Sequence, residues 1–271
     1  MNIFVTFASS NFKDVASRII NEAMSIGYFD KAYSIDETQL TSELLESETF
    51  HVKKGYGLYS WKPDTIWQAL EKAAPNDIIV YCDAGCTLQK SKEWDEYFRL
   101  MESNDALGFR IQQRNFNWTR KSVFDFFKTE IHIDWKNGFQ YGANALIVKN
   151  SEMGKAFISE WRSIMIHRLD LCGDVHPEEK KLEDERFISN RYDQTILTSL
   201  LFKYSEIGNI KSIWEHFEGY DPFREQAVIA TRSRKGRENY NAQSLKHVLW
   251  RLYKDNVMYP YFNVKYKEVL L

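Results

Sequence analysis

The segment Ile78-Ile79-Val80-Tyr81-Cys82-Asp83-Ala84-Gly85-Cys86 decides the fold that this chain is expected to adopt. A short apolar run that is bounded by a turn signal is typical of a strand buried on both faces of a parallel sheet. The run ends abruptly on Asp83, and Gly85 follows closely. Open α/β sheets bind ligands at the carboxyl ends of their parallel strands. The sequence therefore predicts that Asp83 stands at a ligand-binding edge.

The residues before this segment alternate between strand and helix patterns. Residues 3–8 and 31–35 are predicted strands, and a helix between them carries apolar residues at helical spacing (Val15, Ile19, Ile20, Ala23). Residues 65–73 form a further predicted helix, with Pro63 near its first turn and Pro75 just beyond its end. This alternation indicates an α/β fold with a mostly parallel central sheet flanked by helices.

The later residues continue the alternation less regularly. Residues 106–111 and 139–148 are predicted strands, and 92–101, 153–166 and 191–204 are predicted helices. The charged run 169–186 is expected to be a surface excursion. No repeat or linker separates these parts, so the sequence predicts one domain over residues 1–271.

Composition limits the classes of function. The chain has 36 basic and 38 acidic side chains and a net charge of −2, so nucleic acid is not an expected partner. Its three cysteines, Cys82, Cys86 and Cys172, suit neither a disulfide framework nor a zinc site and indicate a reducing compartment. Residues 1–8 resemble a first strand rather than a signal peptide, and no apolar run is long enough to span a bilayer. A cytoplasmic protein is expected.

Residues 231–271 are the one strongly biased part of the chain. They hold nine Lys or Arg residues against three acids, interleaved with aromatic residues. Such a tail could lie against anionic lipid headgroups. It could also close over a diphosphate through residues 232–235, or form a solvated helix face, as charge runs usually do.

Two segments carry the residue types that chemistry needs. Asp83 at a strand end suits a divalent cation or a ribose hydroxyl, although an isolated Asp-x-Gly more often only caps a turn. Residues 55–63 combine two glycines with Tyr56, Trp61 and Lys62 before a helix. Their backbone amides and Lys62 could face phosphates while a ring stacks on a base or sugar. The alternative is an aromatic turn that packs under the sheet.

The order of six sequence pieces resembles the GT-A family of nucleotide-sugar glycosyltransferases, and more narrowly the bacterial enzymes that build capsule, lipopolysaccharide and O-antigen glycans. The pieces are FVTFA (4–8), GYGLYSWKP (55–63), YCDAGC (81–86), NWTRK (117–121), QYGA (140–143) and RYDQ (191–194). They are spread from the first strand to the predicted helix at 191–204. The resemblance implies a single GT-A-like, Rossmann-like domain with a helical or loop elaboration at its C-terminal end.

The resemblance also implies roles for particular residues. Asp193 and Gln194 would be catalytic, either as a general base or as ligands of the sugar and acceptor hydroxyls; a first-turn helix acid is the structural alternative for Asp193. The residues expected to bind the nucleotide donor are Thr6, Phe7, Ala8, Arg18, Tyr56, Trp61, Lys62, Asp83, Ala84, Gly85, Gly142, Ala143 and Arg232. Residues 1–150 would bind the nucleotide sugar, 151–230 the acceptor side, and 231–271 would form the basic aromatic tail.

The chain departs from the family pattern at Gly85, which replaces the second aspartate of an Asp-x-Asp motif that binds a divalent metal. A Mn²⁺ or Mg²⁺ cofactor is therefore uncertain. Asp83 could hold a metal together with the diphosphate and a distant ligand such as His216. Alternatively, basic side chains such as Lys62, Arg18 and Arg232 could replace the metal.

The resemblance implies transfer of a sugar from a nucleotide-diphosphate donor, such as a UDP-sugar, to a hydroxyl of a bacterial surface glycan. The partners would be the donor, a glycan or lipid-linked glycan acceptor, and an anionic membrane that the tail contacts at the inner face. Two alternatives remain open. One is a catalytically silent nucleotide-sugar or glycan-binding protein, and the other is a nucleotidyltransferase-type α/β enzyme.

Overall fold

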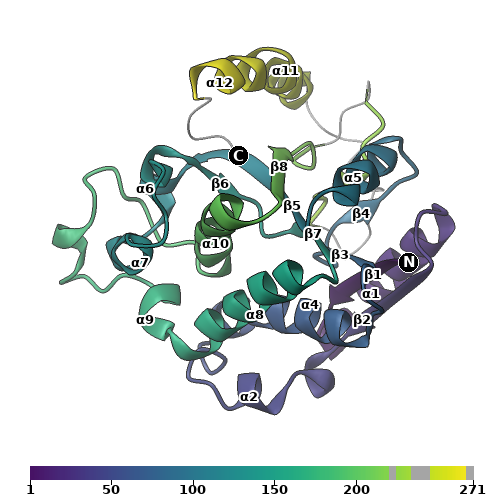
Figure 1. The fold of residues 1–271 in the computed structure, drawn as a ribbon, viewed down its shortest axis with the longest axis horizontal. Helices are drawn as coiled ribbons and strands as arrows, with labels where there is room; N and C mark the ends of the chain where they lie inside the picture. The colour runs from purple at the N-terminus through teal and green to yellow at the C-terminus, as the bar shows by residue number, and fades with distance from the viewer. Residues whose placement is uncertain (220–223, 233–244, 267–271) are drawn as a thin grey trace.

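The computed structural model of the protein describes residues 1–219, 224–232 and 245–266, and a central sheet dominates it (Figure 1). Among these residues the sheet has seven strands in the order β2-β1-β3-β7-β5-β6, and β8 also pairs with β5. The strands are β1 (Asn2–Phe7), β2 (Lys31–Ile35), β3 (Ile78–Cys82), β5 (Ala106–Arg114), β6 (Phe139–Tyr141), β7 (Ala145–Lys149) and β8 (Ile210–Trp214).

Most strands of this sheet share one direction. β1 lies parallel to β2 and β3, and β8 lies parallel to β5. β7 runs antiparallel to both β3 and β5, and β6 runs antiparallel to β5. Among the described strands β1, β2, β3, β5 and β8 therefore point one way, and β6 and β7 oppose them. The predicted α/β fold with a mostly parallel sheet is confirmed.

Helices cover both faces of the sheet because apolar residues alternate along its central strands. Phe4 and Val80 pack on one face with α1 (Lys13–Ser25) and α5 (Glu93–Glu102). Val5 and Ile79 pack on the other with α4 (Trp61–Lys72), α8 (Glu152–His167) and α10 (Asp193–Ile207). Successive side chains of a strand point to opposite faces, so strands this apolar can lie only inside a three-layer domain. Figure 1 shows α4 and α8 side by side on their face.

Shorter elements fill the connections. They are η1 (Ser10–Phe12), η2 (Glu37–Gln39), α2 (Ser42–Leu45), α3 (Gly55–Leu58), β4 (Thr87–Leu88), α6 (Asn115–Trp118), α7 (Lys121–Phe127), η3 (Trp135–Asn137), α9 (Leu169–Cys172), η4 (Lys180–Leu182) and β9 (Val228–Ile229). β4 and β9 pair as a small antiparallel ribbon. The excursion predicted at 169–186 contains only α9 and η4.

The strand predicted over residues 139–148 is wrong in one respect, because residues 142–144 interrupt it. β6 pairs with β5 alone, where Tyr141 lies opposite Arg110, whereas β7 pairs with both β3 and β5. β3 ends at Cys82, and the amide of Asp83 donates to the carbonyl of Asn144 at 2.9 Å. The sheet therefore opens beyond this point, and the opening becomes a cavity. β8 was not among the strands predicted from the sequence.

The C-terminal elaboration packs against the edge formed by β6 and β8. It consists of α11 (Leu245–Tyr253), the π-helical turn η6 (Lys254–Met258) and α12 (Tyr259–Lys265), which form one layer in Figure 1. The Trp214 and Tyr259 rings stack with their centroids 4.3 Å apart. The Lys254 ammonium lies 2.7 Å from Glu215, and both side chains are buried. The division of the chain at residues 150 and 230 stays a prediction, and residues 233–244 and 267–271 lie outside the described part.

Among the described helices, none is both long and apolar enough to cross a bilayer.

Replacing Lys254 by methionine is expected to lower the free energy of unfolding by about 3 kcal/mol, because it leaves the buried Glu215 carboxylate without its cation. Urea unfolding followed by tryptophan fluorescence measures this change. The matched control is Lys265→Met, an exposed lysine of the same layer, which should change the free energy by less than about 0.5 kcal/mol. Equal effects of the two substitutions would show that the ion pair contributes no stability.

Candidate active site

Two adjoining cavities lie at the carboxyl ends of β1, β3, β5 and β8. The first encloses about 670 Å³ and is mainly apolar, with β1 and the turn before α4 in its wall. The second encloses about 500 Å³ and is mainly polar, with the ends of β5 and β8 and the start of α10 in its wall. Tyr59, Asp83, Asn144 and Arg232 line both cavities. Asp83 therefore stands where the two meet, at the edge that the sequence predicted.

Aromatic side chains shape the apolar cavity. The Phe7 ring, at the end of β1, stacks on Trp61 with centroids 4.4 Å apart. Tyr56 lies further out over Phe7 at 6.4 Å and is 46% exposed. The rest of the wall comes from Ala84 and Gly85 after β3, together with residues at the start of α1. These rings offer flat apolar surfaces of the size of a nucleobase.

The turn that carries Tyr56 and Tyr59 has a left-handed backbone. Gly55, Tyr56, Gly57, Leu58 and Tyr59 have φ between 53° and 83° in succession. Such a conformation costs a non-glycine residue roughly 1–2 kcal/mol. The expectation that amides of this segment face phosphates is wrong for the turn itself, because those of Gly57, Leu58 and Tyr59 donate to carbonyls of residues 52–55. The segment instead sets the positions of its rings and of α4.

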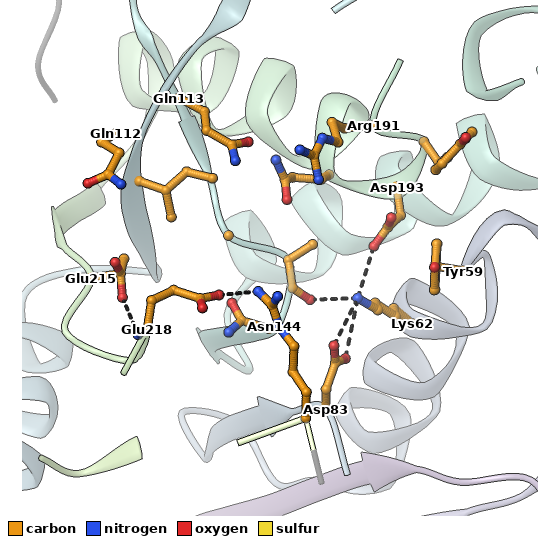
Figure 2. A pocket seen from close by; sticks show the side chains of 16 residues that line it. Tyr59, Lys62, Asp83, Gln112, Gln113, Asn144, Arg191, Asp193, Glu215 and Glu218 are labelled. Atoms are coloured by element: carbon orange, nitrogen blue, oxygen red, sulfur yellow. Dashed lines mark hydrogen bonds and ion pairs between the residues drawn. The ribbon is translucent and has the colours of Figure 1, made fainter. Parts of the chain in front are cut away.

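Lys62 connects two carboxylates in the wall of the polar cavity. Its ammonium lies 3.3 Å from Asp83 Oδ1 and 3.1 Å from Asp193 Oδ2, and it donates to the carbonyl of Ala143 at 3.0 Å. Figure 2 shows the ammonium between the two carboxylates. The side chains of Lys62 and Asp193 are 6% and 5% exposed, whereas that of Asp83 is 33% exposed. Asp83 therefore remains open to a ligand while its partners are buried.

The charges of this triad follow from burial and pairing. Burial raises the pKa of Asp193 to about 6, even though the Lys62 ammonium acts in the opposite direction. Burial alone would lower the pKa of Lys62, but the Asp193 and Asp83 carboxylates hold it above its ordinary value. Lys62 is thus an ammonium at neutral pH, and Asp193 is a carboxylate that accepts a proton more readily than an exposed one.

A second strained residue lies directly before Asp193. Tyr192 has φ 50° and ψ −117°, a combination that is rare outside glycine. Its hydroxyl donates to Asp174 at 2.8 Å, and the Lys54 ammonium lies over its ring at 4.7 Å. Strained backbone concentrates at functional sites, where surrounding contacts enforce it. The strain at Tyr192 orients the first turn of α10, which carries Asp193 and Gln194 into the cavity.

The structure brings most of the predicted site residues to these two cavities. Phe7, Ala8, Tyr56, Trp61, Ala84 and Gly85 line the apolar cavity, Lys62, Gly142, Ala143, Asp193 and Gln194 line the polar one, and Asp83 and Arg232 line both. What these residues bind stays a prediction.

Three predicted residues line neither cavity. Thr6 is fully buried, and its hydroxyl donates to the carbonyl of Cys82, so it joins β1 to β3. Arg18 donates to the carbonyls of Ala84 and Cys86 and thereby holds the loop after β3 from behind. His216 lines a separate cavity beside α5 and β8. For Thr6 and Arg18 the expected contact with the donor is corrected to a supporting position. For His216 the expected role as a metal ligand beside Asp83 is corrected, because it lines another cavity and faces Asp255.

The described residues hold no divalent-metal site made of protein ligands alone, and a cation that binds together with the diphosphate stays a prediction. Among them, no group of three His, Cys, Asp or Glu side chains converges on a point. Near Asp83 the nearest positive group is the Lys62 ammonium, and His216 Nδ1 faces Asp255 at 3.4 Å instead of Asp83. A divalent cation beside Asp83 would need the diphosphate and water as its other ligands, and the Lys62 ammonium would repel it.

Several polar residues of the cavity wall were not among those predicted from the sequence, including two glutamines and two glutamates. Gln112 and Gln113 belong to the last part of β5, and Glu215 and Glu218 follow β8. Figure 2 shows the two glutamates across the cavity from Lys62. Burial raises the pKa of Glu218, whose carboxylate pairs with Arg232. The strand-end rule that identified Asp83 applies equally to Gln112 and Gln113, but Glu215 and Glu218 could not be found because β8 was not recognised.

Comparisons with known proteins give similarities of fold. No protein-family model and no curated protein sequence matches the chain. Its structure resembles that of the galactosyltransferase LgtC in complex with donor and acceptor sugar analogs, with 14% identity, 98% of this chain and 100% of that chain covered, and a TM-score of 0.43. It also resembles mouse xyloside xylosyltransferase 1, with 12% identity, 79% and 85% covered, and a TM-score of 0.40.

A further similarity is to the glycosyltransferase GlyE of Streptococcus pneumoniae TIGR4, with 12% identity, 100% of this chain and 66% of that chain covered, and a TM-score of 0.40.

Replacing Asp193 by asparagine tests the pKa of this carboxyl. In the folded protein Asp193 keeps its proton up to about pH 6, whereas its ordinary pKa is 3.8. It therefore adds stability below about pH 4 that is lost as the pH rises through 6. The free energy of unfolding of the wild type minus that of Asp193→Asn should fall as the pH rises from 4 to 6, measured by urea unfolding.

The comparison variant for this experiment is Asp170→Asn. Arg168 lowers the pKa of Asp170, so the stability that this carboxylate adds is lost only as the pH falls below its ordinary pKa. Its difference from the wild type should stay level between pH 4 and 6. A level difference for Asp193→Asn as well would contradict the raised pKa.

Proposed function

We propose that this protein is a glycosyltransferase that moves a sugar from a nucleotide-diphosphate donor, a UDP-sugar, to a hydroxyl group of an acceptor glycan. One observation carries the proposal. Asp83, a half-open carboxylate paired with the buried Lys62 ammonium, stands between an aromatic apolar cavity and a polar cavity. A nucleotide sugar has the same order of parts, with an apolar base at one end, a charged diphosphate in the middle and a hydroxylated sugar at the other end.

The apolar cavity is the proposed nucleoside site. A base would lie against Phe7, Trp61 and Tyr56, and the Phe7 ring already stacks with the other two. Asp83 would accept a hydrogen bond from a ribose hydroxyl, as strand-end carboxylates do in dinucleotide-binding folds. Its exposed oxygen surface and its place at the junction suit that role.

The diphosphate would lie at the junction of the cavities. Arg232 lines both cavities and is paired with the Glu218 carboxylate. Because the pair is largely exposed, a phosphate can take the place of Glu218 on the guanidinium group. Guanidinium groups bind phosphate through paired hydrogen bonds, and the Lys62 ammonium offsets the two nearby carboxylates that would repel it. In the transition state the bond between the anomeric carbon and the diphosphate oxygen breaks, and fixed cations stabilise the charge that develops there.

The sugar and the acceptor would share the polar cavity. Four carboxamides line it, from Gln112, Gln113, Asn144 and Gln194, and such groups both donate to and accept from sugar hydroxyls. If the reaction inverts the anomeric centre, the acceptor oxygen forms the new bond and Asp193 takes its proton. A base with a pKa of about 6 is ionised at neutral pH and still strong enough for this step. If the reaction retains the configuration, Asp193 and Gln194 hold the sugar.

The acceptor is proposed to be a lipid-linked bacterial surface glycan, met at the inner face of the cytoplasmic membrane. An exposed apolar stripe runs along the C-terminal helices (Leu249, Trp250, Tyr253, Val257, Tyr261, Val264). Its spacing places it on one side of α11, η6 and α12, and residues 231–271 carry an excess of basic residues. Aromatic side chains next to basic residues suit the interface of an anionic bilayer.

The described basic residues of the tail refine this proposal. Arg251 and Lys254 are buried, where Arg251 donates to the carbonyls of His216 and Glu218 and Lys254 binds Glu215. These two cations therefore hold the tail on the domain and are not available to lipid. Substitutions in the exposed stripe test membrane binding more cleanly than removal of the tail does.

Titration calorimetry with UDP tests the donor site, in the presence of Mn²⁺ and, separately, of EDTA. The wild type is expected to bind UDP under both conditions, because Arg232 and Lys62 are the proposed diphosphate partners. Asp83→Asn should lower the rate of UDP-sugar hydrolysis at least 100-fold while the far-UV circular dichroism stays unchanged. Asp95→Asn, an exposed residue of α5, is the control and should hydrolyse at the wild-type rate.

The outcomes of this test separate the alternatives. Absence of UDP binding under both conditions would contradict sugar transfer. Binding without any hydrolysis or transfer would favour a silent nucleotide-sugar-binding protein. Binding that requires Mn²⁺ would contradict only the assignment of the diphosphate to basic side chains.

Sedimentation with vesicles tests the membrane surface. The double variant Trp250→Ser/Tyr261→Ser should bind vesicles containing phosphatidylglycerol about tenfold more weakly than the wild type, and neither protein should bind pure phosphatidylcholine vesicles strongly. The control is Met24→Ser, an equally exposed apolar residue on α1. Unchanged sedimentation of the double variant would exclude the stripe as the membrane contact.

A further inference from the structure

Three carboxamide side chains form a continuous hydrogen-bonded chain beneath the polar cavity. Gln194, on the first turn of α10, donates through Nε2 to Gln140 Oε1 at 2.8 Å. Gln140, on β6, donates through Nε2 to Asn115 Oδ1 at 3.1 Å and to Thr119 Oγ1 at 2.9 Å. Asn115, at the start of α6, donates through Nδ2 to the carbonyl of Trp135 at 2.6 Å. Gln140 and Asn115 are fully buried.

The backbone carbonyl of Trp135 fixes the direction of the whole chain. A carbonyl oxygen only accepts, so Asn115 must present its NH₂ group to Trp135 and its oxygen to Gln140. Gln140 must then present its NH₂ group to Asn115 and its oxygen to Gln194. Reversal of any amide would place two oxygens against each other in a buried site, which costs more than a hydrogen bond contributes.

The last carboxamide therefore has only one orientation. Its NH₂ group is held by Gln140, and its Oε1 accepts no hydrogen bond from the residues that the structure describes, while Gln194 itself lines the polar cavity. An isolated glutamine at a cavity wall could turn to offer either a donor or an acceptor. Here the buried chain removes that freedom and leaves an acceptor.

We infer that Asn115 and Gln140 are positioning residues that hold Gln194 with its Oε1 toward the polar cavity, where it accepts a hydrogen bond from a hydroxyl of the transferred sugar. This inference rests on the proposed function and specifies its sugar site. The site selects a sugar with a free hydroxyl at that position and disfavours one that carries a carboxylate or lacks the hydroxyl there. A half-buried, pre-oriented acceptor discriminates between such analogues, because a missing partner leaves it unpaired.

The neighbours of the chain keep it rigid. The amide of Asn115 donates to the carbonyl of Gly138, and that of Thr119 donates to the carbonyl of Asn115. Thr195, one residue beyond Gln194, donates through Oγ1 to the carbonyl of Trp118 at 2.9 Å. α6, β6 and α10 are thus fastened together around the three carboxamides.

The test uses titration calorimetry with UDP and with UDP-glucose, UDP-galactose and UDP-N-acetylglucosamine. The sugar that binds the wild type most tightly relative to UDP is the probe. Gln194→Met should weaken binding of this UDP-sugar about tenfold and leave UDP binding within twofold. Gln140→Met should do the same, although Gln140 touches no ligand. Gln68→Met, at a distant glutamine of α4, is the matched control and should change neither affinity.

The double variant Gln140→Met/Gln194→Met separates positioning from a general structural effect. If Gln140 acts through Gln194, the double variant binds the UDP-sugar as Gln194→Met does, since the second change has nothing left to disturb. Additive losses, or an equal loss of UDP affinity, would overturn the inference. It would also be overturned if Gln194→Met kept the wild-type affinity, a result that remains decisive should Gln140→Met fail to fold.

Two possible results with the wild-type protein would also overturn the inference. If the wild type binds UDP but none of the three UDP-sugars more tightly than UDP, the inference fails and the nucleotide site stands. If the wild type does not bind UDP at all, the proposed function fails and this inference fails with it.

Discussion

A single buried ammonium joins three distant parts of the chain, and the arrangement of the site depends on it. Lys62 comes from the first turn of α4, Asp83 from the end of β3 and Asp193 from the first turn of α10. Without the ammonium, the two carboxylates would face each other across a water-poor space. Loss of one member of a buried ion pair typically costs 3–5 kcal/mol, on the order of a third of the stability of a domain. The same contact holds Asp193 where a reacting hydroxyl could reach it.

The backbone around this ammonium is strained on both sides. The left-handed turn at 55–59 precedes Lys62, and Tyr192 precedes Asp193. The rings of Tyr59 and Tyr192 face each other with centroids 6.3 Å apart. The two strained segments contact each other through these rings, and the Tyr192 hydroxyl also donates to Asp174. Packing elsewhere in the domain offsets the cost of this strain. The strained backbone holds the Lys62 and Asp193 side chains in place before a ligand binds.

The polar cavity is lined by side chains whose orientations are fixed by hydrogen bonds and ion pairs. The amide chain fixes the orientation of the Gln194 carboxamide, and the Lys254–Glu215 pair anchors the loop that carries Glu218. The opening between β3 and β5 supplies the space, because residues 142–144 leave the sheet there. A site with fixed donors and acceptors loses little entropy when it binds a hydroxylated ligand. The C-terminal helices therefore belong to the architecture of the site as well as to the surface.

The sequence by itself determined the α/β class, the main strands up to Asp83 and the edge at which that carboxylate stands. It could do so because alternation of apolar residues and strand-end glycine are local signals. Only the tertiary structure decided that Thr6 and Arg18 support the site from behind, that His216 lies elsewhere, and that Glu215 and Glu218 enter the cavity. It alone decided the pairing of Lys62 with Asp193 and the direction of the amide chain. Those features depend on contacts between residues far apart in the chain, which no local pattern encodes.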